Sequence, residues 1–139
     1  MRRLESLLVT FWAGSLWTIC GVVAPVLFAT LSDRRLAGEL AGHFFRIETW
    51  LGFAIAIALS GILMSREPRG SRGGKLVLIA ITAGAPLASE VLLRPVMDAA
   101  RATGDMARFG MLHGVSAALF AIACVTAFVL AWRVNRPAA

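Results

Sequence analysis

The residues that could carry chemistry are a few ionisable side chains in an otherwise apolar chain of 139 residues. Two imidazoles with carboxylates could ligate a transition metal, and two imidazoles could bind a haem iron as axial ligands. No predicted helix carries ligands at H-x-x-x-H or E-x-x-H spacing, so either site requires His43 and His113 to meet across two helices. The candidates for a ligand or metal site are His43, Glu48, Glu90 and His113.

The sequence around Glu90 predicts a different kind of pairing, an ion pair within one helix. Glu90, Arg94 and Asp98 follow one another at intervals of four, which places them on one face of a helix. An unpaired carboxylate is costly in the low dielectric of a membrane, so the spacing predicts a structural ion pair among these three residues. Glu90 and Arg94 are also the residues that a transport pathway would use.

Cys20 and Cys124 are the only cysteines of the chain. Both fall inside apolar stretches, and we interpret them as small hydrophobic thiols in packed helices. A disulfide or a soft-metal pair is the alternative. The predicted depths of the two residues differ by roughly one to two helical turns, which argues against it.

Motifs of the common enzyme classes are absent. The chain has no G-x-S-x-G elbow, no P-loop and no dinucleotide fingerprint. Ser116 is the serine nearest to His113, but it lies on the same predicted helix and points the wrong way for a triad. The sequence therefore identifies no catalytic residue and leaves open whether the protein is an enzyme.

The elements that must position these residues are four long apolar stretches, at 7–31, 47–64, 76–93 and 111–132. Each can cross a hydrocarbon layer of about 30 Å as a helix. The composition agrees, since 58% of the residues are hydrophobic and only 16% are charged. We predict an all-α fold: one integral membrane domain over 1–139, a four-transmembrane-helix bundle with short loops. Amphipathic segments at 34–46 and 95–109 are expected at its outer face. The first of them either lies at the membrane interface or is a water-exposed extension of the second span.

The charge distribution predicts the orientation in the membrane. The net charge is +6, but the basic residues sit at segment ends rather than along a helix face, which excludes nucleic acid as a partner. With both termini in the cytoplasm, that side holds eight basic residues and the opposite side six. This favours an N-in, C-in topology. Thirteen Arg against one Lys suggest a GC-rich genome and hence a bacterial inner membrane.

Small residues and prolines predict how the helices pack. Small side chains at intervals of three or four let another helix approach closely inside lipid. We expect these faces to point into the bundle, and a flexible, charged cytoplasmic loop at 65–74 between the second and third spans. The packing residues are Gly14, Thr18, Gly21 and Pro25 on the first span, and Ala80, Gly84, Ala88 and Pro86 on the third.

Three short stretches resemble a known family. They are the run from Trp17 to Leu31 with its Ala24-Pro25 pair, the Ala37-Gly38 to Phe45 segment, and Phe109-x-x-x-His113-x-x-Ser116. Together they resemble the DUF4149 or TMEM205-like family, small bacterial membrane proteins of unknown function. The resemblance implies a four-helix membrane bundle and supplies no reaction.

Three functions follow as hypotheses from these observations. The first is a small membrane protein embedded in the lipid bilayer that acts as an accessory or assembly partner. Its small-residue faces would contact another membrane protein or a second copy. The alternative is a haem- or transition-metal-linked redox or transport protein that uses His43 and His113 with Glu90. A small oligomeric transporter is a third, weaker possibility.

Overall fold

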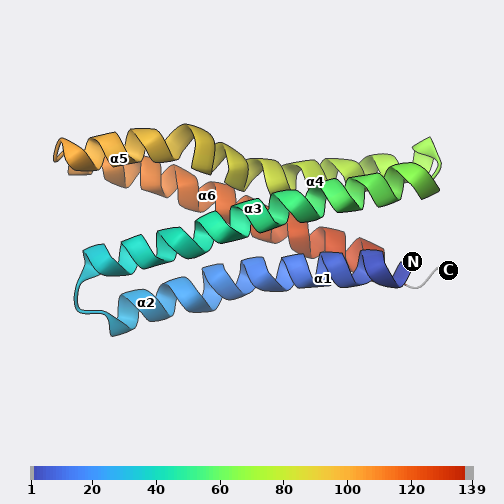
Figure 1. The fold of residues 1–139 in the computed structure, drawn as a ribbon, viewed down its shortest axis with the longest axis horizontal. Helices are drawn as coiled ribbons and strands as arrows, with labels where there is room; N and C mark the ends of the chain where they lie inside the picture. The colour runs from blue at the N-terminus through green and yellow to red at the C-terminus, as the bar shows by residue number, and fades with distance from the viewer. Residues whose placement is uncertain (1, 137–139) are drawn as a thin grey trace.

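The computed structural model describes residues 2–136, and every regular element in this range is helical. The predicted all-α class is confirmed, and the described residues contain four helical rods long and apolar enough to cross a membrane (Figure 1). Two of the rods are interrupted by a π-helical turn. In chain order the elements are α1 (Arg2–Thr18), η1 (Ile19–Val23), α2 (Ala24–Thr30), α3 (Arg34–Arg66), α4 (Arg69–Ala88), η2 (Ser89–Leu93), α5 (Arg94–Ala102) and α6 (Met106–Asn135).

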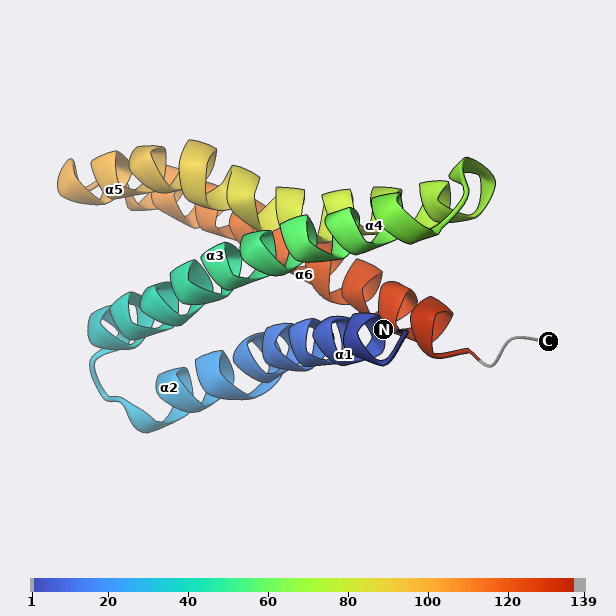
Figure 2. The same cartoon turned by 45° about the vertical axis from the view of Figure 1, so that its right-hand side comes forward.

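The rods form two hairpins that lie across each other. Hairpin 1 is residues 2–66 and hairpin 2 is residues 69–135. The N-terminus, the turn between the hairpins and the end of α6 lie at one end, which we call the terminal end (Figure 1). The connections at 31–33 and 103–105 lie at the other, which we call the loop end. At the loop end α2 packs on α3 and α5 packs on α6, and the two hairpins diverge (Figure 2).

The two hairpins form an internal structural repeat, a feature that our sequence analysis missed. Along the first rod of each hairpin, corresponding residues are 70 positions apart, so η1 and η2 coincide in this register. The second rods correspond from Asp33 and Asp105, which both begin Asp-x-x-x-x-Gly-x-Leu-x-Gly and both cap their helix with the side chain. Because the hairpins run in the same direction, they form a parallel repeat about an axis along the bundle.

Each π-helical turn precedes a proline. Pro25 and Pro95 lack the N–H that an α-helix would use, and each stands second in the α-helix that follows. In both rods the residue before the proline instead bonds five residues back, Ala24 to Ile19 and Arg94 to Ser89. The rods thus stay continuous through their prolines.

The core lies between the hairpins and is richest toward the terminal end. Its largest fully buried side chains include Trp12, Leu16, Leu59, Leu63 and Leu130. Trp12 reaches α3 at Gly52, where an added Cβ would lie 2.5 Å from the indole Nε1. Gly52 is therefore the close approach that lets the indole enter the core.

The helices extend beyond the predicted spans, and the predicted loop at 65–74 is wrong. Only Glu67 and Pro68 separate α3 from α4. The Arg72 guanidinium donates to the carbonyls of Met64 and Glu67 at 3.0 and 3.4 Å, and Lys75 pairs with the Glu67 carboxylate at 2.6 Å. These bonds satisfy the end of α3 and hold the charged stretch in a helix. Residues 34–46 are the start of α3, so they continue the helix of the second span, which was one of the two predicted alternatives.

The small-residue faces do not point into the bundle, which corrects the prediction. Gly14, Thr18, Gly21 and Pro25 are all exposed on the surface of hairpin 1. Of the four predicted packing residues on hairpin 2, Ala80 and Gly84 are exposed, Ala88 is half-buried and only Pro86 is buried. Nothing lies within 4 Å of a Cβ added to Gly14, Gly21 or Gly84. The first and third rods bury Trp12, Leu16 and Ile79 together with the small Ala13 and Ala83, so small residues lie on both the inner and the outer faces.

Candidate functional site

A cavity of about 760 Å³ lies between the hairpins at the loop end. It is lined from η1, α2 and α3 of hairpin 1 and from η2, α5 and α6 of hairpin 2. The rings of Phe45 and Phe120 contact each other across α3 and α6 with centroids 4.6 Å apart, and both line the cavity. The divergence of the hairpins creates this space, and their side chains determine what it can hold.

Corresponding positions of the two hairpins face the cavity with opposite chemistry. Hairpin 1 contributes Cys20, Ala24 and Phe28, which we call the apolar wall. Seventy positions later, hairpin 2 contributes Glu90, Arg94 and Asp98, which we call the charged wall. The cavity is thus amphipathic because one repeat supplies apolar side chains where the other supplies ionisable ones.

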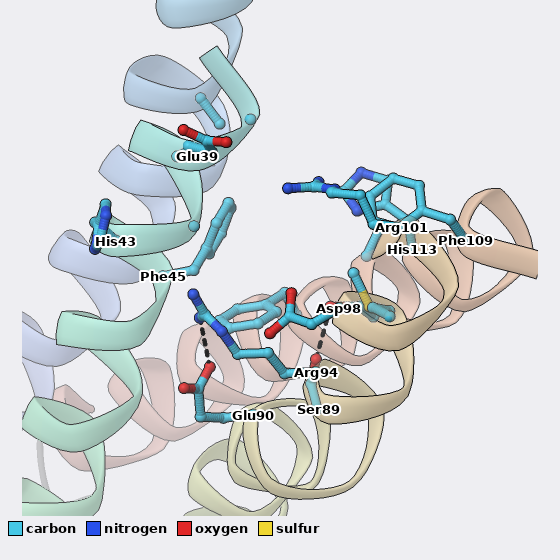
Figure 3. Close-up of a pocket in the computed structure, with 18 of the residues that line it drawn as sticks. Glu39, His43, Phe45, Ser89, Glu90, Arg94, Asp98, Arg101, Phe109 and His113 are labelled. Atoms are coloured by element: carbon cyan, nitrogen blue, oxygen red, sulfur yellow. Dashed lines mark hydrogen bonds and ion pairs between the residues drawn. The ribbon is translucent and has the colours of Figure 1, made fainter. Parts of the chain in front are cut away.

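The charged wall is held in place by two ion pairs, one within hairpin 2 and one that joins the hairpins. Glu90 Oε2 lies 2.9 Å from Arg94 Nη1 (Figure 3). Glu90 Oε1 lies 2.6 Å from Arg46 Nε on α3. The Arg94 guanidinium also lies against Gly42 of α3, 3.9 Å from the place of an added Cβ. Asp98 lines the cavity but makes no ion pair with any residue of 2–136, so the predicted three-residue pairing is wrong for Asp98. Arg46 takes the third place in the cluster instead.

His113 belongs to an aromatic stack at the cavity. Its ring stacks on Phe109 with centroids 5.9 Å apart and planes 10° apart, and the Arg101 guanidinium lies 4.5 Å above the same Phe109 ring (Figure 3). All three line the cavity. The stack positions a cation and an imidazole together on the side of hairpin 2.

His43 does not face His113, although both are among the lining residues. Figure 3 places the His43 ring on the side of α3 away from the Arg101, Phe109 and His113 stack. In the repeated pattern, the position of His113 is held in hairpin 1 by Ala41, which is buried. His43 is two residues further along and so turns to another face of the helix. Within residues 2–136, no three His, Cys, Asp or Glu residues are grouped so that they could hold a metal ion.

Glu48 lies outside the cavity, in the core. Its side chain is buried, at 2% exposure, and its Oε1 accepts a hydrogen bond of 2.9 Å from Ser15 Oγ. The four predicted ligands are therefore distributed among three places: Glu90 and His113 on the hairpin 2 side of the cavity, His43 at its edge on α3, and Glu48 in the core.

One pairing at the cavity was not anticipated from the sequence. Ser89 Oγ and Ser116 Oγ lie 2.6 Å apart and join η2 to α6. Cys20 lines the cavity, and the indole Nε1 of Trp17, three residues earlier, donates to the carbonyl of Cys124 at 3.1 Å. The repeat is the signal that could have found the cavity, because it aligns position 20 with Glu90 and so places both at one level.

Four apolar rods and a hollow between two hairpins define the class of this protein: it is a small membrane protein built as a helix bundle. Residues 7–105 match the family model described as a domain of unknown function, DUF4149, and the chain belongs to this family. The match includes both the apolar and the charged wall of the cavity. No curated protein and no solved structure matches the chain.

Proposed function

We propose that this protein binds a single amphiphile in the cavity, with the apolar body of the ligand on the apolar wall and its polar head at the charged wall. The observation that carries the proposal is the opposed chemistry of corresponding positions in the two hairpins. A volume of about 760 Å³ is typical of a site for a small ligand or a lipid segment.

The head group should accept hydrogen bonds, and a carboxylate fits best. Arg34 and Arg101 line the cavity and make no ion pair with a described residue. Among the carboxylates that line the cavity, only that of Asp98 makes no ion pair with a described residue. Glu39 pairs with Arg35 at 3.1 Å, and Glu90 pairs with two arginines. The cavity therefore has an excess of unpaired guanidinium groups over unpaired carboxylates, which favours an anionic head.

The orientation of the bundle determines which leaflet supplies the ligand. The terminal end carries the larger share of basic residues, so we place it and both termini in the cytoplasm, in a bacterial inner membrane. The cavity then opens toward the outer leaflet. An amphiphile of that leaflet could enter between the diverging ends of the hairpins without crossing the core.

A dansyl-labelled fatty acid, which carries a carboxylate head and an apolar chain, tests this proposal. We expect saturable fluorescence enhancement with one site per chain and a dissociation constant in the micromolar range for the protein in a short-chain detergent. Ala117→Phe should weaken binding about tenfold or more, because Ala117 lines the cavity.

The matched control is Ala118→Phe. Ala118 is the next residue of α6, is also exposed and does not line the cavity, so binding should be unchanged. If both variants bind the probe as the wild type does, the fatty acid sits on the outer surface of the helices and the proposal is wrong. Arg101→Met distinguishes the head-group contact, because it removes a lining guanidinium that has no ion-pair partner among the described residues and should reduce affinity without filling the cavity.

A role as an accessory or assembly partner is a second proposal, favoured by the outward-facing small residues. Gly14 and Gly84 correspond in the repeat, and both leave open space at the surface of the bundle. A second copy or another membrane protein could approach either face closely. Proximity labelling between two tagged copies in membranes should decrease in Gly14→Leu or Gly84→Leu and stay unchanged in Ala118→Phe. Equal labelling in all variants would remove this role for the two faces.

A further inference from the structure

We propose that the cavity opens sideways to the lipid between α2 and α6, and that the hydrocarbon chain of the bound amphiphile leaves through this opening. We call the opening the apolar slot. It is lined by Cys20, Ala24 and Phe28 on hairpin 1 and by Ala117 and Ala121 on hairpin 2. The inference rests on the proposed function and adds the route by which a ligand with a chain longer than the cavity is held.

One hydrogen bond sets the level at which residues of the two rods lie across the apolar slot. At the base of the slot, where α1 packs on α6, the indole of Trp17 donates to the carbonyl of Cys124. The two rods run in opposite directions, so each step from Trp17 toward the loop end matches a step back from Cys124 (Figure 1). Cys20 then lies level with Ala121, and the small residue 24 lies level with residue 117. Small side chains on both rods leave the slot open.

Ala117 and Ala121 lie on the side of α6 that faces hairpin 1. The residues just before them face elsewhere, since the hydroxyl of Ser116 is bonded to a serine of η2 and the ring of Phe120 contacts a phenylalanine of α3. One step along a helix turns a side chain by about 100°. The two alanines are therefore turned away from η2, toward the side of α6 on which the first rod packs.

The opposite side of the cavity, between α3 and the rod of η2 and α5, is closed by charged side chains. Glu90 pairs with Arg46 of α3 at 2.6 Å, and Arg94 lies against Gly42 one turn nearer the loop end. Both contacts join the hairpins, whereas no hydrogen bond or ion pair within residues 2–136 joins α2 to α6. A chain that passed the charged side would separate an ion pair next to lipid, which is costly. The apolar slot carries no such cost.

Two exposed tryptophans report on which side the chain leaves. Trp17 is 50% exposed and lies at the base of the apolar slot. Trp50 is 52% exposed and follows Arg46 by one turn of α3, so it lies on the charged side. In the proposed orientation the chain of an outer-leaflet amphiphile points from the loop end toward the middle of the bilayer. A chain that leaves through the apolar slot therefore runs over Trp17 and not over Trp50.

The experiment follows the tryptophan fluorescence of the full chain in a short-chain detergent during titration with a fatty acid brominated near its methyl end. Bromine quenches an indole that it contacts. The wild type and Trp50→Phe should show saturable quenching of equal depth, whereas Trp17→Phe should lose most of it. The same acid brominated near its carboxylate should bind equally well and quench Trp17 much less, because the head stays at the charged wall.

Displacement of the dansyl-labelled acid measures binding of the brominated acid independently, so the two proposals fail separately. Displacement without a loss of quenching in Trp17→Phe, or with the loss in Trp50→Phe instead, would overturn the apolar slot and leave the binding site intact. If the brominated acid displaces nothing, the proposed site fails and the slot fails with it.

A second measurement uses the unaltered chain, because Trp17→Phe also loses the hydrogen bond to α6. A fatty acid with a diazirine at its methyl end is bound and photolysed, and the labelled peptides are identified by mass spectrometry. The label should fall on peptides of α1 and α6. Label on α3 and α4 instead would show that the chain leaves on the charged side and would overturn the inference.

Discussion

Hairpin 1 and hairpin 2 share a backbone plan and differ in almost every side chain that faces the cavity. Both have a π-helical turn of five residues before a proline, and both begin their second rod at a capping aspartate. At corresponding positions one hairpin carries Cys20, Ala24 and Phe28, and the other carries Glu90, Arg94 and Asp98. The backbone features that the repeats share form the bundle, and the side chains in which they differ give the cavity its chemistry.

The same contrast continues in the core. Trp12 and Thr82 correspond, and both are almost completely buried, at 2% and 1% exposure. In hairpin 1 the large indole requires Gly52 opposite it, whereas in hairpin 2 the small hydroxyl of Thr82 lies 2.8 Å from that of Thr126. One repeat is stabilised by the shape of a packed ring and the other by a hydrogen bond between helices. Substitutions at these positions should therefore differ in cost.

The largest effect is expected for Gly52→Ala. The new Cβ would meet three atoms of the Trp12 ring, at 2.5, 3.1 and 3.4 Å, and the buried ring has no room to shift. We expect a loss of about 1–3 kcal/mol in the free energy of unfolding, measured by denaturant titration in detergent. Gly14→Ala and Gly84→Ala are the controls, with no loss, because nothing lies within 4 Å of their Cβ positions.

A second substitution sharpens this comparison. In a Trp12→Thr background, hairpin 1 carries the side chain that hairpin 2 has at the same position, and the added methyl group of Gly52→Ala no longer meets a ring. The cost of Gly52→Ala should then vanish. If the cost persists without the indole, the glycine is required by the helix backbone rather than by Trp12.

A smaller effect is expected for Glu90→Gln on the charged wall. The substitution leaves Arg46 and Arg94 without their carboxylate, in a place where Glu90 is 12% exposed and the two arginines are 50% and 28% exposed. This partial exposure limits the expected loss of unfolding free energy to about 1 kcal/mol. The exposed Arg35–Glu39 pair gives the control, since Glu39→Gln should cost about 0.3 kcal/mol. Equal costs for the two variants would mean that the link between the hairpins contributes nothing to stability.

The sequence predicted the rods better than it predicted what lies between them. Length and apolarity alone define the four helices, and the interval of four between Glu90 and Arg94 correctly brings the two into contact within one rod. Contacts between rods depend on how the two hairpins cross. The spacing of residues along one helix carries no information about that crossing. The spacing of Gly14, Thr18 and Gly21 is the same whether that face points to a helix or to lipid. Facing directions follow from the repeat, which aligns Ala41 with His113 and so excludes a facing pair with His43.

The smallest effect is expected for Thr82→Val, which separates the contribution of a hydrogen bond in hairpin 2 to the free energy of unfolding from that of burial. Thr82→Val keeps the volume of the side chain and removes a hydroxyl that lies 2.8 Å from both the Leu78 carbonyl and the Thr126 hydroxyl. A hydrogen bond between membrane helices contributes about 0.6 kcal/mol, and we expect a loss of that size. A double-mutant cycle with Thr126→Val should return the same value as a coupling energy, whereas Thr30→Val, whose exposed hydroxyl bonds only to the Val26 carbonyl, should cost less. A coupling energy of zero would mean that both hydroxyls are satisfied by their own helices, and hairpin 2 would then be stabilised by packing alone, as hairpin 1 is.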